Sequence, residues 1–236
     1  MSRSKLVTKL VQNLGQRFSI SLGIDISEAD STQLIKWFLA SILFGARISE
    51  SIVVKTYKQF KEKDVLSAQT ILDTGWDGLV KILDDGGYVR YDFKTATKLL
   101  DIMGSLEKQY KGDLNRLHQK AKDPFDLEKR LKNLGKGIGD VTINIFLREL
   151  RGIWEKADPY PGDLVILAAG NLGFSSQRKS RKDILDELKS LWQKNQVKGK
   201  TFVDFETALL RLGKDFCRKG KCADCIAKSS CKRTEL

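Results

Sequence analysis

Apolar residues recur every three or four positions along most of this chain. The segment from 34 to 43 carries a clear apolar stripe, made by Leu34, Ile35, Phe38, Leu39, Ile42 and Leu43. This spacing places side chains on one face of an α-helix. Strict alternation of apolar and polar residues, which a half-buried strand would need, is convincing nowhere. The pattern predicts an all-α protein.

Helix start and stop signals divide this pattern into separate elements. Asp30 is suited to cap a helix whose Gln33 can reach back to it, and Pro124 fits the first turn of another helix. Further helices are predicted near residues 49–60, 67–74, 76–83, 92–110, 124–134, 140–154, 163–172, 181–195 and 202–216. The chain contains no internal repeat and no low-complexity linker.

The chain is strongly basic. It has 236 residues, of which 41% are hydrophobic and 31% are charged, and its formal net charge is +12. The apolar fraction is ordinary for a globular protein and argues against disorder. The positive charge indicates a nucleic acid or an anionic membrane surface as partner, although a merely basic protein would have the same composition.

No segment approaches the roughly 20 consecutive apolar residues of a membrane helix. The basic start is not followed by the apolar stretch of a secretion signal, because polar residues such as Lys9 and Arg17 interrupt residues 6–22. We therefore expect a protein that is neither secreted nor membrane-bound, located with the nucleoid in a cytoplasm or in a nucleus. Thiols stay reduced in these compartments, so disulfides are not the expected use of cysteine.

Three alternating glycines separate two helical patterns in the middle of the chain. The run comprises Gly135, Lys136, Gly137, Ile138 and Gly139. Glycine allows positive φ angles and close backbone approach, and the free N–H groups at the start of the next helix can bind a phosphate. Ile138 is expected to point into the core. A tight turn between packed helices is the alternative, but in a basic chain the pattern favours a helix-hairpin-helix that contacts DNA without reading its sequence.

All four cysteines lie within fifteen positions near the C-terminus. Cys217, Cys222, Cys225 and Cys231 have the spacing C-x4-C-x2-C-x5-C. Four thiolates at such spacing can hold tetrahedral zinc or a [4Fe–4S] cluster, and a disulfide pair is the less favoured alternative. The basic residues around them form a rim that either meets a phosphate backbone or stays solvated: Arg218, Lys219, Lys221, Lys228, Lys232 and Arg233.

Together these motifs resemble the endonuclease III superfamily of DNA glycosylases. The resemblance runs from about residue 34 to residue 232 and rests on three features in the same order: the hairpin, the tripeptide Pro161-Gly162-Asp163, and the C-terminal cysteines. The segment from Ala46 to Ser49 also resembles the family's first DNA-facing loop. In that loop Arg47 matches the residue that fills the gap left by a flipped base.

This resemblance implies an enzyme of DNA repair. Such an enzyme flips a damaged or mismatched base out of the duplex and hydrolyses its N-glycosidic bond. Asp163 matches the carboxylate that stabilises positive charge on the sugar and orients the attacking water. Without the resemblance, Asp163 is more simply a helix cap. Asp158 is the second candidate for the catalytic role, ranked lower because Pro159 follows it.

Three features depart from the usual pattern of the superfamily. Members that also cut the strand carry a Lys two positions after the last hairpin glycine, where this chain has Val141. The resemblance therefore implies a monofunctional glycosylase, with absent or weak lyase activity. The first cysteine gap is shorter than the usual C-x6-C, which keeps zinc open beside [4Fe–4S]. Residues 157–164 are closer to the alkyl-base glycosylase branch than to endonuclease III itself.

The order of the motifs predicts two helical lobes. One is a helical barrel of residues 31–150 that contains the hairpin. The other combines residues 1–30 with 151–236 and carries Asp163 and the cysteine loop. We expect a monomer that binds double-stranded DNA containing a damaged or mismatched base. The alternative is a non-catalytic DNA-binding protein with a structural zinc or iron–sulfur site.

Overall fold

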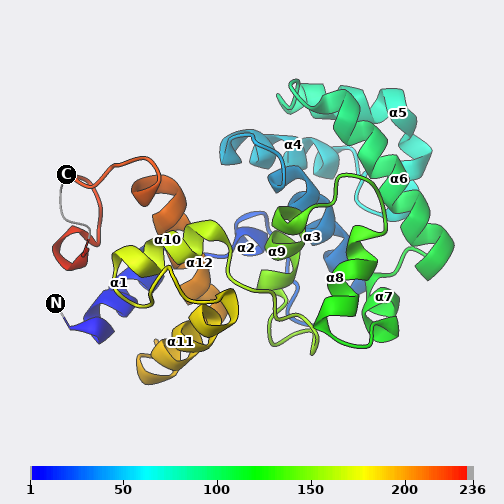
Figure 1. Cartoon of the computed structure of the whole chain (residues 1–236). Helices are drawn as coiled ribbons and strands as arrows, with labels where there is room; N and C mark the ends of the chain where they lie inside the picture. Colours follow the sequence, from blue (N-terminus) through cyan, green and yellow to red (C-terminus); the bar gives the residue numbers. More distant parts are fainter. Residues whose placement is uncertain (1, 233–236) are drawn as a thin grey trace. The chain divides into compact units, whose positions relative to one another are not determined.

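A computed structural model describes residues 2–232 of the chain, and its regular structure is helical (Figure 1). The α-helices are α1 (Arg3–Leu14), α2 (Phe18–Ser21), α3 (Ser31–Phe44), α4 (Glu50–Glu62), α5 (Ala68–Asp85), α6 (Asp92–Tyr110), α7 (Leu114–Lys120), α8 (Pro124–Lys132), α9 (Asp140–Glu149), α10 (Asp163–Asn171), α11 (Arg181–Lys194) and α12 (Phe202–Leu212). A π-helical turn, Gly213–Cys217, continues α12, and a short 3-10 helix covers Lys228–Ser230.

The predicted all-α class is confirmed. Residues 2–232 form no strand, and their only β-type pairing is an isolated bridge between Arg151 and Trp154. No helix in this range is both long and apolar enough to cross a membrane.

Several helix limits agree with the sequence pattern. α6 covers the predicted residues 92–110, and α10 begins at Asp163. α5 is interrupted at Gly75, whose φ of 66° and ψ of 177° are non-helical, at the point where two helices were expected to meet. The prediction for α9 was too long: the helix ends at Glu149, because the chain then turns through Gly152, whose φ is 77°. α1, α2 and α7 were not predicted.

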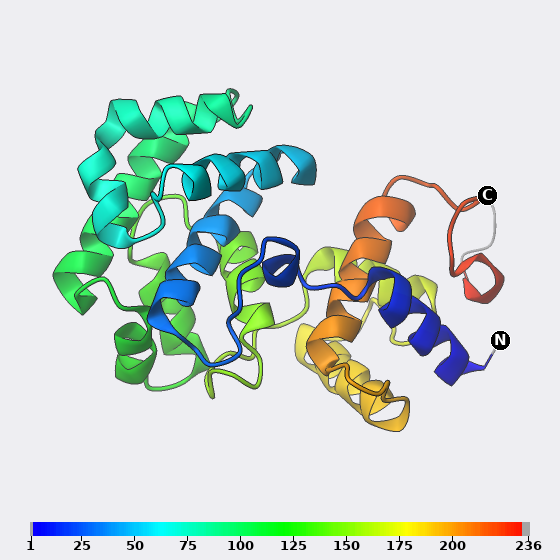
Figure 2. The ribbon, with the colours of Figure 1, turned by 180° about the vertical axis from the view of Figure 1, so that it is seen from behind.

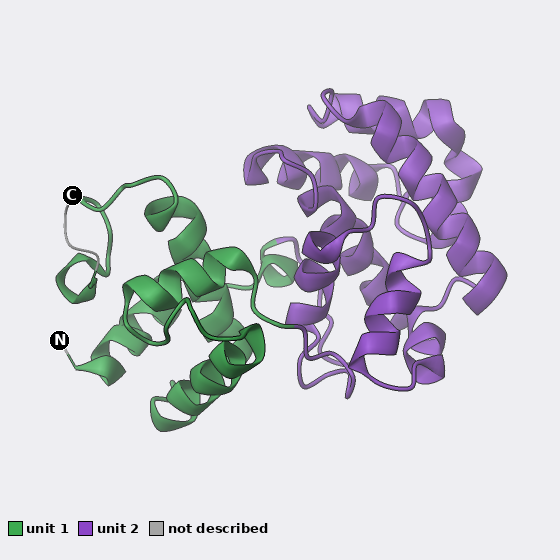
Figure 3. Cartoon of the chain, in the orientation of Figure 1, with its two compact units in different colours: residues 1–21, 160–236 green, residues 22–159 purple. Residues whose placement is uncertain are grey.

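The chain divides into two compact units (Figure 3). Unit 1 combines Met1–Ser21 with Tyr160–Leu236, and unit 2 comprises Leu22–Pro159. Unit 2 is thus longer at both ends than the lobe of residues 31–150 that the sequence suggested. The glycine run belongs to unit 2, whereas Asp163 and the cysteines belong to unit 1.

Unit 2 is built around α3. Apart from Lys36, every residue from Leu34 to Leu43 is buried, as expected for a helix that is apolar on all sides. The Asp30 carboxylate caps this helix by accepting from the Gln33 amide at 3.0 Å. The indole of Trp37 donates to the carbonyl of Phe146 in α9 at 3.1 Å. This bond satisfies the one polar group that the buried indole carries.

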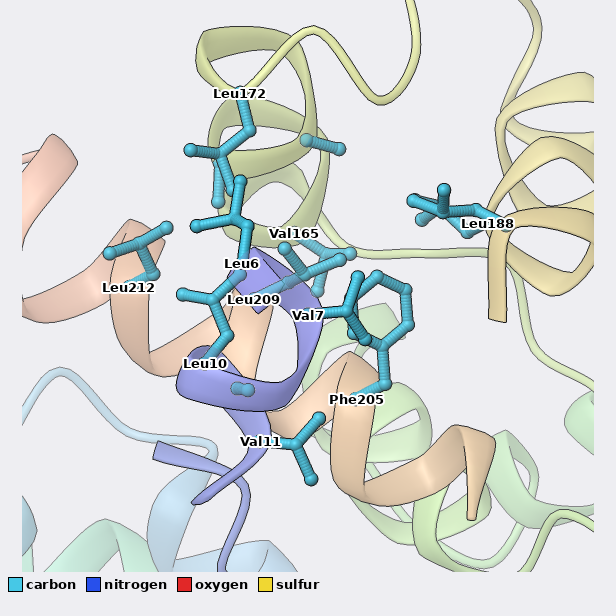
Figure 4. Packing of buried hydrophobic residues seen from close by; sticks show 14 of the residues in the cluster. Leu6, Val7, Leu10, Val11, Val165, Leu172, Leu188, Phe205, Leu209 and Leu212 are labelled. Atoms are coloured by element: carbon cyan, nitrogen blue, oxygen red, sulfur yellow. The ribbon is translucent and has the colours of Figure 1, made fainter. Parts of the chain in front are cut away.

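Unit 1 has a separate core formed by α1, α10, α11 and α12. Figure 2 shows α1 lying beside α12. The side chains that α1 contributes come from two successive turns of one face, and Figure 4 shows them among residues from the other three helices: Leu6, Val7, Leu10 and Val11 from α1; Val165 and Leu172 from α10; Leu188 from α11; Phe205, Leu209 and Leu212 from α12. Burial of these groups is the main favourable contribution to the folding of unit 1.

The end of α12 lies unusually close to the start of α10. A Cβ atom on Gly213 would overlap the backbone carbonyl oxygen of Leu164, the second residue of α10. Both partners of this contact are backbone, so no side chain can move aside to make room. Gly213 therefore fixes the position of the helix turn that carries Asp163.

We expect Gly213→Ala to destabilise the protein by roughly 1–3 kcal/mol, as overpacking does. The backbone angles of Gly213 are helical (φ −60°, ψ −45°), so alanine adds no backbone strain and the methyl clash alone is tested. Urea unfolding followed by circular dichroism measures the change.

Gly104→Ala is the matched control, because it also lies in a helix. A Cβ there has Leu72 Cδ2 at 3.9 Å as its nearest neighbour, an ordinary contact. This substitution should be neutral or stabilising by up to about 1 kcal/mol. Equal stability of the two variants would contradict the packing argument.

Candidate functional site

The glycine run forms a turn between α8 and α9. Gly137 has a φ of +90°, in the left-handed region where glycine is favoured. Leu134 and Ile138 are buried, whereas Lys136 and Gly139 are exposed. The two apolar side chains thus anchor the turn in the core of unit 2, and the turn itself stays at the surface.

This turn lies directly on α6. A Cβ on Gly135 would be 2.8 Å from Cγ1 of Ile102, and one on Gly137 would be 2.8 Å from Cε of Lys98. Lys98 and Ile102 are one helical turn apart, so a single face of α6 supports both glycines. Because glycine has no Cβ, the turn can lie this close to α6.

Lys98 is a basic residue of this region that the sequence did not reveal. It is half-buried, and this burial lowers the pKa of its ammonium group. Within the described residues no carboxylate forms an ion pair with it. Because 39 positions separate Lys98 from Gly137, no local pattern could have indicated the contact.

The first two residues of α9 are exposed to solvent. Gly139 is its N-cap and has no side chain to satisfy the amides of the first turn. Asp140 is highly exposed, and its carboxylate pairs with Lys132 Nζ of α8 at 2.5 Å. This lysine offsets the negative charge that would otherwise disfavour an anion at the helix start. Val141, the next residue, is 63% exposed.

The loop that contains Arg47 packs against the same helix. A Cβ on Gly45 would overlap the hydroxyl of Thr142 in the first turn of α9. The hydroxyl of Tyr88 donates to the carbonyl of Leu43 at 2.7 Å, which holds the end of α3. Arg47 is exposed, and no ion pair to it exists within the described residues. The structure therefore brings the Arg47 loop and the glycine turn to the first turn of the same helix.

Asp163 is the first residue of α10, with Gly162 as its N-cap. Its side chain is 88% exposed. The guanidinium of Arg181, at the start of α11, donates from Nη2 to Asp163 Oδ1 at 2.6 Å and from Nη1 to the Pro161 carbonyl at 2.7 Å. Arg181 thus holds both ends of the Pro161-Gly162-Asp163 turn. Its role was missed from the sequence because the partners are 18 positions apart.

Asp158 has a comparable arginine partner in unit 2. Arg151 donates to the Asp158 carboxylate and to the carbonyl of Pro159. The Arg151 side chain is only 6% exposed, in contrast to the half-exposed Arg181. A nearly buried guanidinium depends on such partners for its stability. This geometry favours a structural role for Asp158.

The four cysteines follow α12, are partly buried and form no disulfide within the described residues. Burial raises the pKa of the Cys217 and Cys225 thiols, and a side-chain hydrogen bond between Asn171 and Cys217 opposes the shift at Cys217. Within residues 2–232 no three His, Cys, Asp or Glu side chains are grouped closely enough to hold one metal ion. The thiols are nevertheless close enough to influence one another's charge.

The cysteine loop is fastened to the rest of unit 1 by polar contacts. The Lys232 amide donates to the carbonyl of Asn171, the last residue of α10, at 2.6 Å. Lys9 of α1 donates to the carbonyl of Ile226 at 2.7 Å. Four basic residues of the predicted rim, and Lys232 beside them, are exposed: Arg218, Lys219, Lys221 and Lys228. Arg233 lies outside the described residues.

The fold matches solved structures of endonuclease III bound to DNA. A structure of a non-covalent endonuclease III–DNA complex aligns with 98% of this chain and 96% of its own, with a TM-score of 0.57 and 14% identity. A structure of a trapped covalent endonuclease III–DNA intermediate, an estranged-adenine complex, aligns with 98% of this chain and 97% of its own, with a TM-score of 0.54 and 15% identity. No protein-family model and no curated protein matches the sequence. The chain therefore has the all-helical endonuclease III fold.

Proposed function

We propose that this protein is a DNA repair glycosylase that flips a damaged or mismatched base and hydrolyses its N-glycosidic bond. The observation that carries the proposal is that the endonuclease III fold spans 98% of the chain. The glycine turn, the Asp163 turn and the cysteine loop follow one another along that fold. The proposed partner is double-stranded DNA, bound by a monomer in a nucleoid or a nucleus.

The glycine turn and the start of α9 are proposed to bind a DNA phosphate. The first-turn amides of α9 have no intrahelical acceptor, and the helix dipole favours an anion there. Lys132 already offsets the charge of Asp140, and the cations of Lys98 and Lys136 add attraction that does not depend on base sequence. Contacts of this kind set the register of the protein on the duplex.

Arg47 is proposed to fill the space that the flipped base leaves. It lies on an exposed loop held against α9 through Gly45 and Thr142. A base inside the duplex is out of reach of any catalytic group, so it must leave the stack first. A long cationic side chain fixed near the phosphate site can occupy the gap and keep the base outside.

Asp163 is proposed to act on the sugar. Breaking the N-glycosidic bond develops positive charge on the deoxyribose, as in other glycosidic cleavages. An ionised carboxylate beside the ring stabilises that charge, and it can orient or deprotonate the attacking water. The exposed position of Asp163 at the start of α10 leaves its carboxylate accessible to a nucleotide that approaches unit 1.

The enzyme is proposed to be monofunctional. A lyase step requires a lysine amine at the sugar, and Val141 stands at the position where the resemblance would place it. The exposed side chain of Val141 is apolar and cannot form a Schiff base. Water would then be the only nucleophile in the reaction.

The four cysteines are proposed to hold a [4Fe–4S] cluster, with zinc as the alternative. Four thiols in one loop are a donor set that suits either group. Cys217 and Cys225 pack against the apolar core of unit 1, which shields part of the site from water. When bound, the cluster would cross-link the basic loop and hold it rigid, without taking part in base removal.

We expect Asp163→Asn to reduce base release by at least roughly 10²–10³-fold, because it removes the charge that stabilises the sugar cation. Binding to undamaged duplex should not be weakened. Single-turnover release from a panel of single-lesion duplexes measures the first quantity, and fluorescence anisotropy measures the second.

Asp186→Asn is the control for the charge change, because Asp186 is an exposed carboxylate on α11 of the same unit. It should release bases at the normal rate. Unchanged turnover in Asp163→Asn would contradict the catalytic assignment. If the native protein released no base from any lesion, the function would be DNA binding alone.

Borohydride added during turnover should trap no covalent protein–DNA adduct, because no lysine occupies the lyase position. Denaturing electrophoresis checks this, with a bifunctional glycosylase as the positive control. A strong adduct band would show that another amine reaches the sugar, and peptide mapping would then distinguish Lys98 from Lys136.

Protein purified without oxygen should be brown, with broad visible absorbance and about four iron and four sulfide per chain, as a [4Fe–4S] cluster requires. Cys222→Ser should lose most of the iron, because the chain has no spare cysteine. A colourless preparation with one equivalent of zinc would replace the cluster assignment with the zinc alternative.

A further inference from the structure

Arg181 binds the carboxylate that the proposed function makes catalytic. Its two terminal nitrogens contact Asp163 Oδ1 at 2.6 Å and the Pro161 carbonyl at 2.7 Å. Both partners belong to the same turn, and Arg181 itself starts α11 next to its cap, Ser180. The fork geometry of a guanidinium suits such paired acceptors.

This ion pair is solvent-exposed. The Asp163 side chain is 88% exposed and that of Arg181 is 49% exposed. Pairs of this kind contribute little to stability, because water solvates both charges well when they separate. The Asp163–Arg181 pair can therefore open at small cost when a better partner for either group arrives.

A permanent pair would oppose catalysis. The carboxylate stabilises a sugar cation by its negative charge, and a guanidinium held against it cancels much of that field. A DNA phosphate is a competing acceptor that can also take two hydrogen bonds from the fork. Binding of DNA to unit 1 would bring such phosphates near Arg181.

We propose that Arg181 exchanges partners: it binds Asp163 in the free protein and a backbone phosphate in the DNA complex. The exchange leaves the carboxylate unpaired at the moment when the sugar is present. It also couples the arrival of a phosphate at α11 to the release of Asp163. This inference rests on the proposed function only for the role of Asp163, because the phosphate contact can be tested without catalysis.

The first test is binding of undamaged duplex by Arg181→Gln over a range of salt concentrations. We expect several-fold weaker binding and a slope of log K against log salt that is smaller in magnitude by about 0.9, the value for one lost phosphate contact. Arg181→Lys should keep the slope, because it keeps the charge, but bind less tightly without the fork.

Arg178→Gln is the matched control. Arg178 is an exposed arginine in the loop before α11, with no ion pair within the described residues. If Arg178→Gln changes binding and slope as much as Arg181→Gln does, the effect belongs to general charge and the specific exchange is refuted.

The second test is a double-mutant cycle between the two partners. Asp163→Asn frees Arg181, so it should tighten binding of undamaged duplex by up to about fivefold, equivalent to about 1 kcal/mol. In the Arg181→Gln background the same substitution should have an effect below about twofold. Equal effects in both backgrounds would show that the two residues do not compete, and would overturn the proposal.

The third test separates exchange from simple positioning. At subsaturating protein, single-turnover base release by Arg181→Gln should fall by the same several-fold factor as its binding of undamaged duplex, because under exchange the arginine acts through its phosphate contact. A large loss of rate with unchanged binding of undamaged duplex would mean that Arg181 stays on the carboxylate and orients it, which refutes exchange. Failure of the proposed function itself has a different signature, since Asp163→Asn would then leave base release unaffected while the cycle still reports on Arg181.

Discussion

The close contact between Gly213 and the backbone of Leu164 is the constraint on which unit 1 depends. It places the first turn of α10 against the end of α12, where no side chain could intervene. The two ends of α10 adjoin the two features of the unit to which we assign a function. Asp163 begins the helix, and Asn171 ends it with hydrogen bonds to both ends of the cysteine loop. One short helix therefore links the proposed catalytic carboxylate to the proposed metal site, and its contact with Gly213 limits where it can lie.

In unit 2, the proposed phosphate site is a surface turn that buried side chains hold in place. Ile138 and Leu134 are buried and hold the glycine run, while Gly135 and Gly137 let it lie on Ile102 and Lys98 of α6. The backbone of the turn before α9 can then remain exposed to solvent while its position stays fixed. The ammonium of Lys98, which has no ion pair among residues 2–232, is half-buried beside this turn, and partial desolvation strengthens its attraction for any anion that reaches it.

The sequence could predict those features of the fold that depend on residues close together in the chain. Helix α6, the break at Gly75 and the start of α10 at Asp163 all follow from periodicity, glycine and capping, which are local signals. α1 was not predicted although its signal is local: Leu6 and Leu10 are one helical turn apart and are both buried. The polar residues Lys9 and Gln12 were weighed only as evidence against a secretion signal. The contacts of Lys98 and Arg181, in contrast, have no local signal. They join residues 39 and 18 positions apart, and only the packed structure determines them.

Asp158 and Asp163 lie on either side of residues 159–160, where the chain passes from unit 2 to unit 1. They show how burial changes the behaviour of two similar ion pairs. Each is bound by an arginine that also holds a neighbouring proline carbonyl. Arg151 is almost fully buried, so separating Asp158 from it would remove a charged partner from a desolvated cation, which costs more than at an exposed pair. Arg181 is half exposed, so water can replace either partner and the pair can open. Asp163 can therefore leave its arginine at a smaller cost to the fold than Asp158 can, and the proposed catalytic role of Asp163 requires this property.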